Sequence, residues 1–109
     1  MAYDQQLASR IRKYFSGRED VVEKTMFGGL AFMLSGNMCV GATDHRLMAR
    51  VGPKRYDHVL KNMHATIMDF TGKPLKGFVY VEPEALEEDN HLHQWIEQCE
   101  NFVRSLPPK

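Results

Sequence analysis

The amino-acid sequence predicts an α+β fold in two layers, an antiparallel β-meander sheet with helices packed on it. Near both ends of the chain, apolar residues recur at intervals of three and four, as on one face of a helix. Between Val21 and Val51 the apolar period changes to two, which is typical of strands. Short turns divide this stretch, and such connections force consecutive strands to lie antiparallel. The expected order is helix, four strands, helix, strand, helix.

The first helix is indicated by an apolar stripe of Leu7, Ile11, Tyr14 and Phe15. Asp4 is placed to cap its start, and Gly17 is placed to end it. Because the intervening residues are polar, we expect an amphipathic helix whose apolar side packs on the sheet.

The four strands of the meander are expected at residues 22–27, 30–34, 38–42 and 46–51. The first connection contains the pair Gly28-Gly29, which suits a tight turn or a bulge because glycine enters left-handed conformations without a side-chain penalty. A phosphate-binding loop is the alternative, but such loops lead into a helix. Here an apolar, strand-like run from Leu30 to Leu34 follows, which favours the turn.

After the meander, Pro53 is suited to the first turn of a short helix that carries Tyr56, Val59, Leu60 and Met63. Residues 65–76 read as an irregular stretch, and residues 78–81 as a fifth strand. The last helix has the clearest pattern, with an apolar stripe of Leu92, Trp95, Ile96, Cys99, Phe102, Val103 and Leu106. Asp89 or Asn90 would cap this helix, Pro107-Pro108 would end it, and Trp95 would enter the core.

A chain of 109 residues fits a single domain, residues 1–109, with a core of its own. No apolar run approaches the roughly 18 residues of a membrane span, and the first residues lack the pattern of a signal peptide. These features predict a cytoplasmic protein. Cys39 and Cys99 form no C-x-x-C pair, so we expect them to act as small buried apolar side chains.

The formal net charge is zero, which argues against a protein that grips nucleic acid mainly through its overall field. The charges are nonetheless segregated. Seven basic residues lie in a block from Arg46 to Lys76, and seven acidic residues without Lys or Arg lie in a block from Gly77 to Glu100. Two solvated faces that pair with each other are the simpler interpretation, and a partner-docking surface is the alternative.

No pattern of catalytic or ligand-binding residues is present in the sequence. The five histidines lack the H-E-x-x-H spacing of a zinc site, and the serines lack the G-x-S-x-G context of a nucleophile. Neither a G-x-x-x-x-G-K-[ST] loop nor a G-x-G-x-x-G motif occurs. We therefore expect no enzyme activity, no metal site and no cofactor.

A binding site, if present, is expected at the hairpin tips and the basic face. Its candidate residues are Lys24, Gly28, Gly29, His45, Arg46, Arg50, Arg55 and Lys76. Arg46 and Arg50 are four apart on one strand and would share one face of the sheet, facing solvent. This arrangement suits an anionic partner, and it equally suits a plain exposed strand.

Three motifs give the chain a family resemblance: Thr25-Met26-Phe27-Gly28-Gly29-Leu30, Lys76-Gly77-Phe78-Val79-Tyr80-Val81, and the ending Arg104-Ser105-Leu106-Pro107-Pro108-Lys109. Together they make nearly the whole chain resemble the N-terminal domain of the TfoX/Sxy competence regulators. The resemblance implies a secretion-chaperone-like α+β fold. It also implies a role in natural transformation, because these bacterial regulators act with a cyclic-AMP receptor protein on competence genes. Full-length regulators carry a second domain, so the chain resembles a stand-alone N-terminal domain.

The resemblance supplies no catalytic residues, and three functions remain open. The first is a small bacterial regulatory or protein-interaction module, with a transcription factor as a possible partner and a homodimer as another possibility. The second is a nucleic-acid-associated factor that uses the Arg46 to Lys76 block. The third is an enzyme of unknown type.

Overall fold

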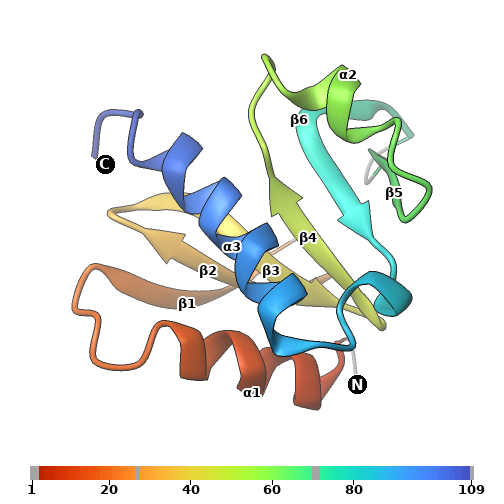
Figure 1. Cartoon of the computed structure of the whole chain (residues 1–109). Coiled ribbons are helices and arrows are strands. Elements are labelled where there is room, and N and C mark those ends of the chain that lie inside the picture. The colour runs from red at the N-terminus through yellow and green to blue at the C-terminus, as the bar shows by residue number, and fades with distance from the viewer. Residues whose placement is uncertain (1–2, 27, 70–71, 109) are drawn as a thin grey trace.

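The computed structural model describes residues 3–26, 28–69 and 72–108. Its elements, in chain order, are α1 (Gln5–Tyr14), β1 (Val21–Met26), β2 (Gly29–Leu34), β3 (Asn37–Thr43), β4 (Arg46–Arg50), α2 (Tyr56–Val59), β5 (Ala65–Asp69), β6 (Pro74–Val81), the 3₁₀ turn η1 (Pro83–Ala85) and α3 (Asp89–Val103). Over these residues the strands form one six-stranded antiparallel sheet in the order β1-β2-β3-β4-β6-β5. Figure 1 shows α1 and α3 lying across one face of this sheet, which confirms the two-layer α+β fold.

Helix α1 begins as the sequence predicts. The Asp4 carboxylate accepts hydrogen bonds from the backbone N–H groups of Gln6, at 2.8 Å, and Leu7, at 3.2 Å. These bonds satisfy two of the donors that a helix start leaves free. Leu7 and Ile11 are buried against the sheet, so the apolar stripe fixes the side of the helix that packs.

Gly28 lies in the turn between β1 and β2, as predicted, and Gly29 is the first residue of β2. Gly28 has a φ of 73°, in the left-handed region that favours glycine. A Cβ on Gly29 would collide with the carbonyl oxygen of Ala42 on β3, so close strand packing requires glycine there. Phe27, which was expected to end the first strand, lies outside the described residues.

Within the stretch that was predicted to be irregular, residues 65–69 and 74–76 lie in strands. They contain β5 and the start of β6, which pair with each other from Ala65↔Val81 to Asp69↔Pro74. The register shifts between Ile67 and Asp69, and the burial along β5 therefore does not alternate. A strand with a bulge loses the period of two by which sequence reasoning finds strands. Phe70 lies outside the described residues.

The start of α3 also differs from the prediction, by one residue if Asp89 is taken as the expected cap and by two if Asn90 is. The helix begins at Asp89, so its N-cap residue is Glu88, whose side chain makes no capping hydrogen bond. The helix ends at Val103, before the last residue of the predicted stripe, Leu106. None of the helices in the described part of the chain is long and apolar enough to cross a membrane.

The main core lies between the sheet and its helices. Branched aliphatic side chains dominate it, including Val40, Leu47 and Val79 of the sheet and Ile96 of α3. Trp95 packs against this core but stays half-buried. The opposite face of the sheet carries a smaller cluster of Ala31, Met38, Met48, Met68 and Tyr80.

Candidate functional site

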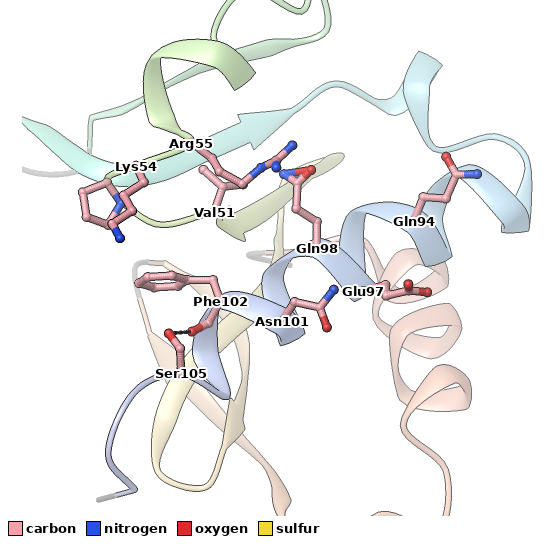
Figure 2. Close-up of a pocket in the computed structure, with 10 residues that line it drawn as sticks. Val51, Lys54, Arg55, Gln94, Glu97, Gln98, Asn101, Phe102 and Ser105 are labelled. Carbon is pink, nitrogen blue, oxygen red and sulfur yellow. Dashed lines mark hydrogen bonds between the residues drawn. The ribbon is translucent and has the colours of Figure 1, made fainter.

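A groove runs between α3 and the segment from Val51 to Arg55, which links β4 to α2. We call it the α3 groove, and its volume is about 600 Å³. A second hollow of about 250 Å³ shares Arg55, Gln94 and Gln98 with it and reaches Trp95. Figure 2 shows the groove between the side chains of α3 and those of the linking segment.

The backbone of Gly52 shapes one wall of this groove. Its φ is 89°, and a Cβ at this position would collide with the ring of Phe102 on α3. The Gly52 amide also donates to the carbonyl oxygen of Gly77 on β6, at 3.1 Å. A glycine at this point lets the chain turn away from β4 while the Phe102 ring packs closely against it.

The floor of the α3 groove is apolar. Val51 is buried, and Phe102 packs against the main core while part of its side chain stays exposed. Pro53 lies beside them in the lining. An apolar floor with a few polar groups around it is the usual composition of a small-molecule site.

Two positively charged side chains, those of Lys54 and Arg55, lie at the rim of the groove without a described residue that binds them. Within the described residues, no hydrogen bond, ion pair or ring contact involves the side chains of Lys54 or Arg55. Both side chains are exposed. Their positive charge is therefore available to an anionic group in the groove.

Gln98 supplies the most unusual polar atom of the site. Over the residues that the structure describes, its Nε2 is the only buried side-chain nitrogen or oxygen without a hydrogen-bond partner. Buried polar groups in folded proteins are nearly always paired, because an unmade bond leaves the desolvation cost uncompensated. Figure 2 shows the ends of the Gln98 and Arg55 side chains pointing toward one another across the groove.

Sequence reasoning included only Arg55 of the groove among its candidates. A usable signal was nevertheless present in α3, where Gln94, Gln98 and Asn101 follow one another at intervals of four and three. These intervals place uncharged polar side chains on one side of a helix. Such a stripe does not by itself indicate a functional site, because uncharged amides are not catalytic groups.

The flank of α3 that faces α1 carries a different polar group, the nearly buried carboxylate of Glu100. It accepts hydrogen bonds from the Tyr14 hydroxyl at 3.1 Å, from Arg18 at 3.1 Å and from Arg104 at 2.6 Å. We call these four residues the Glu100 network. Burial raises the pKa of the Glu100 carboxyl, but the bonds from Arg104, Arg18 and Tyr14 outweigh it, so the net pKa is lowered.

The same network changes the titration of its other members. Burial, followed by the charge of Glu100, raises the pKa of Tyr14 to about 12. The Arg18 guanidinium also binds Asp20. The hydrogen bond to Asp20 is the largest cause of the raised pKa of Arg18, and Glu100 makes a smaller contribution. These shifts keep the carboxylate and the guanidinium charged, so the network joins α1, the chain that follows it and α3.

The structure places the predicted hairpin residues on separate corners of the sheet. Lys24 lies on β1, Gly28 lies in the turn to β2, and Gly29 begins β2. His45, in the turn between β3 and β4, has its Nδ1 at 3.7 Å from the Asp4 carboxylate. Arg46 pairs with Asp44 at 3.0 Å, and its guanidinium lies 3.8 Å from the centre of the Tyr80 ring.

The remaining predicted residues are also dispersed. Arg50 donates to the carbonyl oxygen of Met38 at 3.3 Å and lies 5.2 Å and 5.7 Å from the ring centres of Phe78 and Phe102. Burial lowers the pKa of this guanidinium, and Arg50 is half-buried, so it faces solvent only in part. Lys76 is exposed on β6. The structure therefore does not bring the predicted residues together into one site.

The two charge blocks are not joined by ion pairs within the described residues. Asp89 of the acidic block instead pairs with Arg10 of α1, at 3.1 Å. Glu100 pairs with Arg18 and Arg104. The acidic block therefore attaches the N-terminal helix and its following turn to α3.

The two cysteines are free and buried, as expected. Burial raises the pKa of the Cys39 thiol to about 12, and burial also raises that of Cys99. Neither thiol is therefore activated as a nucleophile. The part of the chain that the structure describes contains no group of three or more His, Cys, Asp or Glu residues suited to a metal ion.

Comparison with known proteins gives one match. The family profile described as the TfoX N-terminal domain matches residues 13–103, which include every strand, α2, α3 and the end of α1. No curated protein and no solved structure matches the chain. Because the match covers most of the sequence, the chain belongs to the TfoX N-terminal domain family.

Proposed function

We propose that this protein is a small bacterial regulatory module that binds another protein through the free edge of β1. In this proposal it acts in the cytoplasm, without catalysis, in the transcriptional control of DNA uptake. Membership of the TfoX N-terminal domain family supports the regulatory role. The partner that this role suggests is a transcription factor of the cyclic-AMP receptor type.

The free edge of β1 carries the proposal. β1 is the first strand of the sheet and pairs with β2 along all six of its residues (Figure 1). Its four central residues are exposed, and Val22 retains 62% of its accessible surface. An exposed edge strand can accept a strand from another protein through backbone hydrogen bonds.

The hydrogen-bond pattern shows which amides of β1 are free for such pairing. The Ser35 N–H donates to the Asp20 carbonyl oxygen at 2.8 Å, which makes these residues a hydrogen-bonded pair. Such pairs alternate along an antiparallel ladder. In the observed register, the backbone groups of Glu23 and Thr25 therefore point away from β2.

The alternation provides a selective test. Thr25→Pro removes an outward N–H without breaking a bond to β2, and proline is tolerated at such edge positions. We expect the purified chain to bind the cyclic-AMP receptor protein of its own bacterium in isothermal titration calorimetry. Thr25→Pro should weaken this binding at least about tenfold, whereas Thr25→Val, which keeps the N–H, should preserve it.

Two results would contradict the proposal. One is the absence of a complex between the two purified proteins. The other is equal affinity of the Thr25→Pro and Thr25→Val variants, which would move the contact away from the edge. A homodimer that Thr25→Pro dissolves would assign the edge to a second copy of the chain.

A further inference from the structure

We propose that the α3 groove binds a small organic anion that has one carboxylate and an apolar body. This inference goes beyond protein binding at β1, because it assigns a ligand site to a different part of the molecule. Its basis is the combination of an apolar floor, an unpaired buried amide and unpaired cations in one groove.

The shape of the groove fits a small molecule. Its volume of about 600 Å³ falls within the roughly 300–1,000 Å³ that is typical of ligand sites. Val51, Pro53 and Phe102 provide an apolar surface for the body of the ligand. Part of the Phe102 ring is exposed, so an aromatic ligand can pack against it.

Gln98 requires a hydrogen-bond acceptor at a defined place. Its Nε2 is buried without a partner over the described residues, and the residue lines both the α3 groove and the adjoining hollow. A carboxylate oxygen accepts hydrogen bonds and donates none, so it complements this N–H group. Because the Nε2 is shielded in the free chain, the Gln98 side chain would rotate to bring its N–H group to a ligand oxygen, which would then provide the hydrogen bond that the protein does not.

The charges of the rim favour a carboxylate over a neutral oxygen. Lys54 and Arg55 have no acidic partner among the described residues, and both line the groove. Hydrogen bonds between such cations and a carboxylate are stronger than bonds between neutral groups. Figure 2 shows the ends of the Arg55 and Gln98 side chains near one another, between Lys54 and Glu97, so one carboxylate can contact both.

Glu97 limits the charge that the ligand can carry. It also lines the groove, and Figure 2 shows it at the opposite end from Lys54. Its carboxylate would repel a second anionic group there. The site therefore suits a monocarboxylate and disfavours dicarboxylates and phosphate esters with a charge at each end.

The single tryptophan of the chain makes binding observable. Trp95 lines the hollow that adjoins the groove, together with Arg55 and Gln98. The experiment titrates the full chain with hydrocinnamate and with octanoate while Trp95 fluorescence is recorded. The neutral analogues hydrocinnamamide and octanamide keep the size of each probe and remove its charge.

We expect saturable binding of at least one carboxylate, with an affinity at least fivefold higher than that of its amide. The double variant Lys54→Ala/Arg55→Ala should lower this affinity about tenfold, and Gln98→Leu should lower it about threefold. The matched control is Lys24→Ala/Lys73→Ala, which also removes two exposed positive charges but lies outside the groove lining. This control should bind like the wild type.

Several outcomes would overturn the proposal. They are the absence of saturable binding by either carboxylate, equal affinity for the carboxylate and its amide, and an equal loss in the control variant. An acidic peptide that binds the groove when neither small carboxylate does would replace the small molecule with a protein segment. Since all the substituted cations are exposed, the variants should fold, and circular dichroism checks this directly.

Discussion

The two flanks of α3 differ in whether their buried polar groups are hydrogen-bonded. On the flank toward α1, the Glu100 carboxylate accepts hydrogen bonds from Tyr14, Arg18 and Arg104. On the flank toward the α3 groove, only two residues earlier, Gln98 keeps a buried Nε2 without a partner among the described residues. The buried polar group of the first flank has its hydrogen bonds within the protein, whereas that of the second flank has an N–H group left to donate to a ligand.

This difference separates a polar group that supports folding from one that can support binding. Glu100 joins segments that are far apart in the chain, and the loss of any partner leaves a charge poorly solvated. The Gln98 amide makes no hydrogen bond to another described residue, so an added acceptor would offset the desolvation cost of its buried N–H group. Substitutions on the two flanks should therefore have different consequences.

The largest expected effect is that of Glu100→Ala. The substitution leaves Arg18 and Tyr14 without their shared acceptor, and we expect it to lower the free energy of unfolding by about 3 kcal/mol. The measurement is urea unfolding followed by circular dichroism. Glu97→Ala, one turn earlier and exposed, should change the stability by less than about 0.5 kcal/mol. Similar losses in both variants would refute the distinction between the two flanks.

Gly52→Ala should have the next largest effect, on the groove side of α3. The new methyl group meets the Phe102 ring, and the positive φ strains any side chain, so we expect a loss of about 2 kcal/mol. Gly17→Ala is the matched control, because Gly17 has a φ of 80° but open space around its Cβ position. The control should lose only about 1 kcal/mol. Equal losses, measured by urea unfolding, would show that Phe102 does not restrict this turn.

The smallest effect is a pH dependence that originates in Glu100. Its folded pKa is lowered, so its charged form contributes stability above its unfolded pKa of about 4.5, and this contribution is lost as the pH falls through the folded value. The stability difference between the wild type and Glu100→Gln should therefore shrink below about pH 4.5. Urea unfolding at a series of pH values measures it. A difference that is constant across this range would mean that the carboxylate is not stabilised by its partners.

The local elements of the fold were largely accessible from the sequence. The Asp4 cap, the Gly28-Gly29 turn and the meander from Val21 to Arg50 follow from patterns within a few residues of one another. β5 escaped prediction because its register shift near Ile67 removes the alternation of exposed and buried residues. The start of α3 was placed one or two residues too late because Glu88 precedes the helix without a capping hydrogen bond.

The candidate site was harder to predict from the sequence. The sequence pointed to basic residues, and of these only Arg55 lines the α3 groove. Arg50 was expected to face solvent, but it packs between the rings of Phe78 and Phe102, and Arg46 pairs with Asp44. The sequence shows that a residue is charged, but it does not show whether the fold places an acidic group or an aromatic ring beside that charge.

By itself, the sequence determined the α+β class, the cap of α1, the turns of the meander and the family to which the chain belongs. These properties depend on periodicity, on glycine geometry and on neighbouring residues, all of which can be recognised in the order of the amino acids. Only the tertiary structure decided that Glu100 meets Tyr14 and Arg18, and that Gln98 faces the segment of Arg55 without a hydrogen-bond partner among the residues that the structure describes. Hydrogen-bond satisfaction is a property of groups that meet in space, and the residues concerned lie tens of positions apart in the chain.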